Sequence, residues 1–127
     1  MSHQSRLVYG SIPTLTKEEI VGAIERADQA ELHIVVLAAA LGIEDLEWVQ
    51  KVCLSLANHP EPTVRGNAIL GLGHLARIHG RLNRSLVEPA VLLALSDPDR
   101  YVRGQAEAAA DDVEHFLGWN LRRSGSS

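Results

Sequence analysis

The residues best suited to chemistry lie near the C-terminus, where Asp111 and Asp112 precede His115. If this stretch is helical, both carboxylates meet the imidazole on one helix face, because residues three and four apart are neighbours. General acid–base catalysis or a metal site would need such proximity. An ion pair on the helix surface explains the same spacing more simply, and a patch for a basic partner is a further explanation. We favour the ion pair.

The other polar residues form no recognisable catalytic or metal-binding motif. His74 and His79 are five residues apart, which does not place both on one helix face, and the chain has no His-Glu-x-x-His sequence. No glycine-rich phosphate loop follows a strand, and no Ser/His/Asp order indicates a nucleophile. We therefore expect no catalytic residue, no metal, no cofactor and no enzymatic activity.

A second group of residues surrounds a tryptophan. Trp48 follows Glu44, Asp45 and Glu47, and a tryptophan with acids around it can anchor a cationic partner. Packing between helices is the commoner role of such a residue. Cys53 is expected to be a small buried apolar residue.

A nine-residue pattern occurs twice, over 60–68 and again over 98–106. Pro, Val, Arg, Gly and Ala recur in register, and Asn67 aligns with its longer homologue Gln105. A fixed period of about 40 residues is typical of a helical solenoid, in which each unit buries its apolar face against a neighbour.

The local signals predict an all-α fold, a short right-handed α-solenoid of about three helical hairpins. A capping box at Thr16 opens the first helix, and Gly42 is predicted to end the second in a left-handed conformation. Pro89 is expected in the first turn or at a kink, and Trp119 to fold back. The predicted helices are 17–27, 30–41, 45–57, 62–79, 84–96 and 100–117.

These helices make up a single domain over 16–119. Residues 1–15 are predicted to be an extended lead-in, and 120–127 a disordered tail. The aromatic content of 4% suits closely packed helices better than a β-sandwich.

The segment from Leu92 to Ala106 resembles the signature of HEAT repeats. It places an apolar helix before the Asp97-Pro98 turn, and Val102-Arg103 open the next helix. The unit at 45–79 matches this pattern too, whereas the unit at 16–42 matches in helix lengths and closing glycine alone. The resemblance implies that Arg65 and Arg103 are structural arginines that pair with turn acids such as Asp97.

Helical periodicity separates a core side from an exposed side on the last helix of each clear repeat. The predicted core residues are Val64, Ala68, Leu72, Leu75, Val102, Ala106, Ala110 and Val113. In HEAT-like stacks the second helix of each pair lines the concave face, so the opposite rows are predicted to form a partner-binding groove. Its residues are Asn67, Leu70, His74, Arg77, Gln105, Ala108, Asp111, Asp112 and His115. Gly66 and Gly104 lie among them and allow the close approach of a helix or of a partner's backbone.

The chain is also similar to small bacterial HEAT proteins, through the run 64–77 and the segments 101–106 and 109–112. Some of these are immunity proteins of contact-dependent or polymorphic toxin systems. The resemblance implies a cytoplasmic protein that binds a cognate toxin domain, often a nuclease, and blocks its active site or the path of its substrate. Acids could then occupy the cationic groove of a basic toxin. On this hypothesis, the double substitution of Asp111 and Asp112 by lysine weakens binding without unfolding the chain.

Two other classes of function remain open. One is a scaffold or adaptor that binds a host regulatory protein or peptide in the same groove. The other is enzymatic or DNA-related, as in HEAT-like alkylpurine glycosylases and bilin lyases. The net charge is −4, and no basic stripe is present, so we expect no nucleic-acid partner. No apolar run suits a membrane span, and the free chain is expected to be a monomer or a weak dimer.

Overall fold

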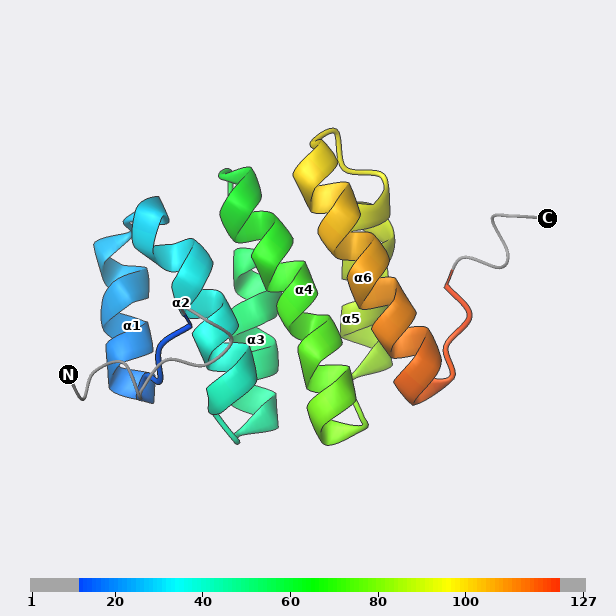
Figure 1. Cartoon of the computed structure of the whole chain (residues 1–127), viewed down its shortest axis with the longest axis horizontal. Helices are drawn as coiled ribbons and strands as arrows, with labels where there is room; N and C mark the ends of the chain where they lie inside the picture. Colours follow the sequence, from blue (N-terminus) through cyan, green and yellow to red (C-terminus); the bar gives the residue numbers. More distant parts are fainter. Residues whose placement is uncertain (1–11, 122–127) are drawn as a thin grey trace.

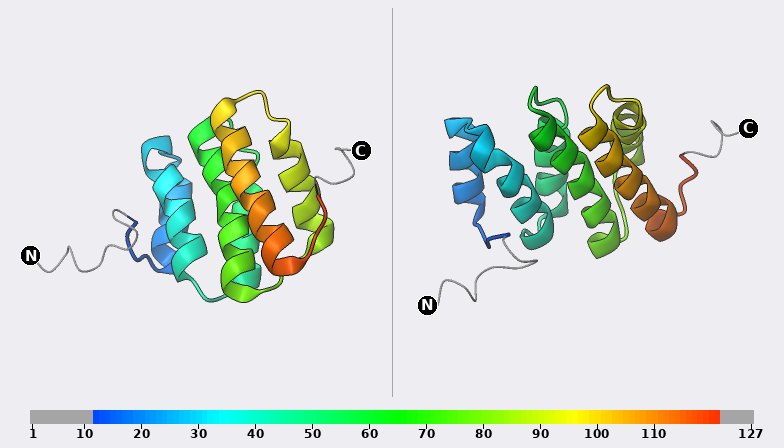
Figure 2. Two further views of the ribbon diagram at one scale, coloured as in Figure 1. Left: turned by 45° about the vertical axis from the view of Figure 1, so that its right-hand side comes forward. Right: turned by 45° about the horizontal axis from the view of Figure 1, so that its top comes forward.

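The computed structural model describes residues 12–121, which form six α-helices. Helices α2, α4 and α6 lie side by side in one layer, and α1, α3 and α5 form the layer behind them (Figures 1 and 2). The all-α solenoid fold predicted from the repeat is therefore confirmed. The helices are α1 (Lys17–Arg26), α2 (Gln29–Gly42), α3 (Leu46–Leu56), α4 (Pro62–His79), α5 (Arg84–Leu95) and α6 (Arg100–Leu117).

Capping side chains mark where four of the helices begin. Thr16 accepts a hydrogen bond from the Glu19 backbone N–H, and the Glu19 carboxylate accepts one from the Thr16 backbone N–H, so the predicted capping box is present. The carboxylates of Asp28, Asp45 and Asp99 cap α2, α3 and α6 by accepting hydrogen bonds from backbone N–H groups of the first turn. Helix α4 instead begins with proline, whose missing N–H would have no partner there.

Left-handed residues end three helices, at Ala27, Gly80 and Gly118. The prediction for Gly42 was wrong, because Gly42 is the last residue of α2 and the next residue, Ile43, is extended with φ −90°. The chain leaves α2 directly toward α3, so no left-handed residue is needed. Pro89 lies inside α5, which continues through it.

The core lies between the two layers. All eight predicted core residues of α4 and α6 are fully buried at 0% exposure. They pack with apolar side chains from every other helix, which include Ile20, Leu32, Val36, Val49, Val87 and Val91. Trp119 folds back as predicted and is buried, with the Arg84 guanidinium 5.0 Å from its ring centroid.

Helices α4 and α6 approach each other closely at a glycine. A β-carbon at Gly73 would lie 2.9 Å from the Ala109 Cα, so any larger residue would force the two backbones apart. Residues 1–11 of the predicted lead-in (1–15) and residues 122–127 of the predicted disordered tail (120–127) lie outside the described residues.

Candidate functional site

Arg65 of α4 joins the second repeat to the third. Its Nε and Nη2 donate to the two carboxylate oxygens of Asp97 at 2.8 and 2.9 Å, while Nη1 donates to the carbonyls of His59 and Pro60. The hydrogen bonds from Arg65 hold the pKa of Asp97 below its usual range, because they favour the charged carboxylate. The ladder contact implied for Arg65 is formed here.

Asn67 links three helices in the same layer. It is 3% exposed, and its Nδ2 donates to the His33 carbonyl of α2 at 2.8 Å. Its Oδ1 accepts hydrogen bonds from the Tyr101 hydroxyl and from Gln105 Nε2 of α6, at 2.5 and 2.8 Å. Asn67 was placed in the predicted groove, but the structure buries it between helices, where its amide positions the neighbours of α4.

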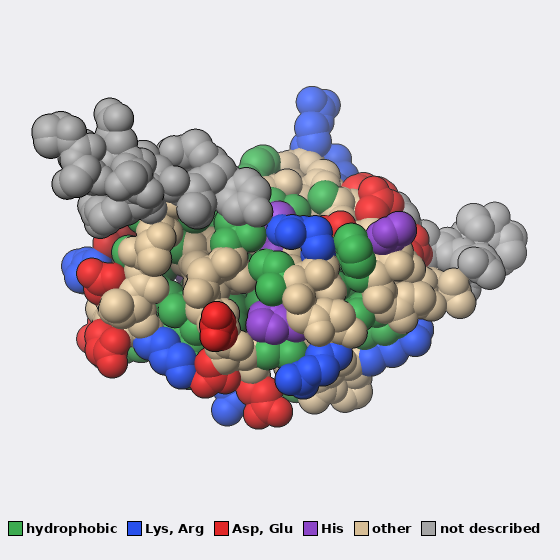
Figure 3. Space-filling view, turned by 60° about the horizontal axis from the view of Figure 1, so that its bottom comes forward, with side chains coloured by type: hydrophobic (Ala, Val, Ile, Leu, Met, Phe, Trp, Pro, Cys, Tyr) green, Lys and Arg blue, Asp and Glu red, His purple; other side chains and the backbone are tan. Residues whose placement is uncertain are grey.

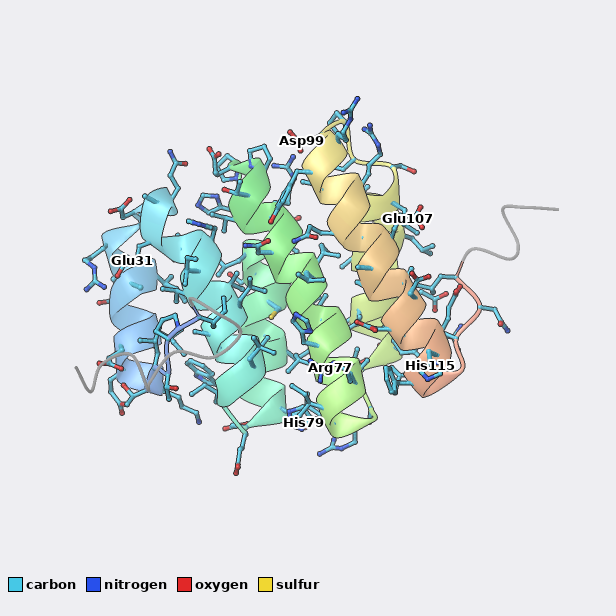
Figure 4. The ribbon with its side chains drawn as sticks, in the orientation of Figure 1. Glu31, Arg77, His79, Asp99, Glu107 and His115 are labelled. Atoms are coloured by element: carbon cyan, nitrogen blue, oxygen red, sulfur yellow. The ribbon has the colours of Figure 1, made fainter. Side chains whose placement is uncertain are left out.

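The exposed seam between α4 and α6 is the candidate functional site. We call it the α4–α6 face, defined by residues that are partly or fully exposed: Leu70, His74, Arg77, Tyr101, Gln105, Ala108, Asp112 and Phe116. Figure 4 shows Arg77 near the end of α4 and His115 near the end of α6. In Figure 3, histidine and basic side chains are mixed with hydrophobic ones on the neighbouring lower end of the molecule.

His74 lies in the middle of this face. Its Nδ1 is 3.2 Å from Arg77 Nη2, and a β-carbon at the adjacent Gly73 would lie 2.9 Å from Asp112 Oδ2. Burial lowers the pKa of His74, and the Arg77 charge lowers it further, while Asp112 opposes both. A neutral imidazole between an arginine and a carboxylate can donate or accept a hydrogen bond, which suits recognition of a polar partner surface.

The predicted groove residues of α6 face two different directions. Gln105 and Asp112 face α4. Gln105 lies beside the position of a β-carbon at Gly66, and Asp112 beside that of a β-carbon at Gly73. Asp111 and His115 are exposed and occupy other angles of the helix, away from these contacts. The His115 ring lies edge to face against Phe116, with centroids 4.5 Å apart.

The patch around Trp48 already holds a cation from this chain. Lys17 Nζ of α1 is 2.7 Å from Asp45 Oδ2 and 5.2 Å from the centroid of the Trp48 ring. The hydrogen bond from Lys17 lowers the pKa of Asp45. Trp48 is half-buried against the core, and Glu44 and Glu47 are exposed. Lys17 thus takes the position that the sequence suggested for a partner's cation.

Two aromatic side chains on this face were absent from the predicted site. Tyr101 and Phe116 are 44% and 43% exposed, and tyrosine and phenylalanine are enriched in protein interfaces. Burial raises the pKa of Tyr101, although its hydrogen bonds to Gln105 and Asn67 act in the opposite direction. The sequence could have indicated both residues, because Tyr101 and Phe116 share one side of α6 with Gln105 and Asp112 at helical spacing.

A shallow apolar hollow of about 550 Å³ lies on the other layer, between α3 and α5. Leu86, Pro89 and Leu93 of α5 line it, together with the Arg65–Asp97 pair. Across residues 12–121, no group of three His, Cys, Asp or Glu side chains could hold a metal ion. Within the same range, no helix has the length and apolar character to cross a membrane.

Comparisons with known proteins agree with this geometry. Residues 49–79 match the model of the HEAT repeat family. Among solved structures, the chain is similar to a chain from the CDI complex of Cupriavidus taiwanensis LMG 19424, with 27% sequence identity and a TM-score of 0.72. The similarity covers 87% of this chain and 97% of that chain. Among curated proteins, no match was found. The chain therefore carries a HEAT repeat within a HEAT-like α-solenoid, and the resemblance to contact-dependent inhibition systems predicted from its sequence is confirmed.

Proposed function

We propose that this chain is an immunity protein that binds and blocks the toxin domain of a contact-dependent inhibition system. The observation that carries the proposal is the similarity to a chain of a CDI complex, which extends over 97% of that chain. Because nearly all of that chain is matched, the similarity extends over the whole fold of one chain of that complex. On this proposal it acts by binding and has no enzymatic activity of its own.

The α4–α6 face supports a binding role. Helix α6 presents two half-exposed aromatic side chains, Tyr101 and Phe116, and the two helices add polar groups of both charges, including Arg77 and Asp112. Aromatic residues and arginine contribute most of the energy in many protein interfaces. The face is also firmly supported from beneath, since Asn67 and the close contact at Gly73 fix the spacing of the two helices.

Exposed acids on α6 suggest the charge of the partner. Glu107 and Asp111 are exposed on the outer side of α6, and Asp112 lies on the seam (Figure 4 labels Glu107). Carboxylates arranged along one helix favour a basic surface, and complementary charge mainly raises the association rate and the selectivity. We therefore propose a basic toxin domain, of which a nuclease is the natural example because it must bind phosphate groups.

A co-expression assay tests this proposal. The candidate toxin is the product, or C-terminal domain of the product, of the gene beside this one. It is expressed from an inducible promoter in cells with or without this chain. The proposal expects arrested growth without the chain, full growth with it, and a stoichiometric complex on co-purification.

The control is an unrelated HEAT-like protein of similar length expressed to the same level. Failure of this chain to protect cells or to form a complex would overturn the proposal. The adaptor alternative would then be preferred, because a HEAT-like solenoid can equally bind a housekeeping protein.

A further inference from the structure

The second and third repeats contact each other through a small set of side chains at the start of α4. Three consecutive residues at the start of α4, which we call the α4 triad (Arg65, Gly66 and Asn67), receive two side chains of the next repeat. Arg65 holds the Asp97 carboxylate through two hydrogen bonds. The Tyr101 ring lies on Gly66, where a β-carbon would be 3.0 Å from its Cδ2, and the Tyr101 hydroxyl donates to Asn67. The bound pair is an acid followed four residues later by a tyrosine.

The same three positions recur at the start of α6, where no side chain of a further repeat is docked among residues 12–121. This α6 triad is Arg103, Gly104 and Gln105, in register with the α4 triad. Arg103 Nη1 donates to the carbonyls of Asp97 and Pro98, just as Arg65 Nη1 binds those of its own turn. The correspondence therefore extends to the orientation of the guanidinium.

Within the described residues, the atoms of the α6 triad that correspond to the binding atoms of the α4 triad are not occupied by another repeat. Among residues 12–121, no carboxylate lies within ion-pair distance of Arg103. A β-carbon at Gly104 would meet nothing within 4 Å. Gln105 Nε2 donates to Asn67 and Tyr101 of the preceding contact, just as Asn67 Nδ2 donates to α2. No donor from the described part of the chain bonds to Gln105 Oε1.

A second copy of this chain does not fit the α6 triad. The N-cap residues Asp28 of α2 and Asp99 of α6 put the first and third repeats in register. Arg26 then stands where Asp97 stands, and Ala30 where Tyr101 stands. Head-to-tail stacking of two copies would bring Arg26 against Arg103, and like charges so placed repel. The occupant is therefore a different protein.

We propose that the α6 triad is a docking site for a helix of the partner protein that has an acid in the turn just before the helix and a tyrosine four residues after that acid. The acid binds Arg103 Nε and Nη2, the ring lies on Gly104, and the hydroxyl donates to Gln105 Oε1. This proposal rests on the proposed function in that the natural partner is the toxin domain. The toxin domain would then place an acid of its own against the start of α6 and its basic surface against the acids further along this helix.

A peptide experiment tests the docking site without the toxin. The probe is a synthetic peptide that copies residues 95–110 of this chain and so contains the bound pair. It is added at up to several millimolar to the ¹⁵N-labelled full-length chain, because an isolated short helix is marginally stable and binds weakly. The expected result is a dose-dependent shift of the Arg103, Gly104 and Gln105 signals. The control peptide carries Asn and Phe in place of Asp97 and Tyr101, and it should cause no such shift.

Variants of the full-length chain sharpen the result. Gly104→Leu fills the space for the tyrosine ring and should abolish the shifts, and its fold is preserved because the position is open. Arg103→Gln should reduce binding at least tenfold, whereas Arg100→Gln on the same helix turn should bind like the natural chain. Absence of shifts at millimolar peptide, or equal shifts with the control peptide, would overturn the proposal.

The toxin domain separates this proposal from the proposed function. If the toxin domain binds the natural chain, Gly104→Leu should weaken binding at least tenfold. Equal binding of toxin by the natural chain and by Gly104→Leu would refute the docking site and leave the immunity function standing. If the toxin domain does not bind the natural chain at all, the immunity function fails, and the peptide experiment still decides the docking site.

Discussion

Arg65 and Asp97 form a bidentate ion pair across the boundary between the second and third repeats, with side chains 18% and 12% exposed. Both oxygens of the carboxylate are used, and a further hydrogen bond from the Asp99 backbone N–H reaches Asp97 Oδ1. Because water has limited access, the pair is stronger than a typical surface ion pair. It fixes the turn before α6 against the start of α4.

Removing one partner of this pair should destabilise the fold. Asp97→Asn or Arg65→Gln is expected to lower the free energy of unfolding by about 2 kcal/mol, since the remaining charge is left partly buried. Chemical denaturation followed by circular dichroism measures this loss. Lys17, which pairs with Asp45 at the surface, offers a matched control: Lys17→Gln should change the stability by less than about 1 kcal/mol.

The same pair makes stability depend on pH. Arg65 lowers the pKa of Asp97 in the folded protein. The ionised carboxylate therefore contributes fully to the free energy of unfolding above its unfolded pKa of about 3.9, and this contribution is lost as pH falls through the lower folded pKa. The natural chain should therefore lose more stability than Asp97→Asn when pH falls from 5 to about 3. Parallel stability curves for the two proteins over this range would contradict the assignment.

Replacing the buried Gly73 and the exposed Gly104 by alanine should change the stability in opposite directions. At Gly73 the new methyl group meets the backbone of Ala109 at 2.9 Å, so Gly73→Ala should destabilise the chain by about 1–3 kcal/mol. At Gly104 the methyl group meets nothing, so Gly104→Ala should stabilise it by about 0.5–1 kcal/mol through helix propensity. Thermal unfolding of the two variants and the natural chain measures these changes as shifts of Tm. A similar change of Tm in both would mean that α4 and α6 are not closely packed.

The hydrogen bond between Tyr101 and Asn67 should contribute measurably to the packing of the repeats. Tyr101→Phe removes the donor and should cost about 1 kcal/mol, and Asn67→Leu should cost about 2 kcal/mol because the His33 carbonyl also loses its donor. A double-mutant cycle between these two positions measures their coupling. Strictly additive effects would show that the two side chains act independently.

Cys53 should be unreactive in the folded protein. Its side chain is fully buried, and burial raises the pKa of the thiol to about 12. Since the thiolate is the reactive form, a thiol reagent at pH 8 should label Cys53 only through unfolding. The labelling rate should therefore rise with denaturant in step with the unfolding transition. Rapid and complete labelling without denaturant would show that the α3–α4 contact opens readily.

Asp111 gives a cleaner test of charge recognition than the double substitution suggested by the sequence. Asp112 lies against Gly73, beside His74, so a lysine there would disturb the packing of α4 on α6. Asp111→Lys is exposed and should slow association with a basic toxin domain, most strongly at low salt. Stopped-flow or surface-binding kinetics measure this effect, and the control is Glu25→Lys on α1, an exposed acid of the opposite end. An unchanged association rate at low salt would remove Asp111 from the interface.

The sequence by itself determined the helices and the solenoid. Capping at Thr16, Asp45 and Asp99 is decided within three residues, and left-handed ends at Gly80 and Gly118 depend on the missing β-carbon. Helical periodicity then identified the buried side of α4 and α6, and the repeated pattern predicted how the units stack. All of these signals act over short distances along the chain or by simple repetition.

Tertiary structure alone decided which side chains meet. Asn67 is bound by α2 and α6, each more than 30 residues away, and Lys17 fills the Trp48 patch from another helix. Periodicity gives the angle of a residue on its own helix, but the neighbour at that angle depends on packing. This is why Gly66 is covered by Tyr101 while Gly104, at the same position of the next repeat, stays open.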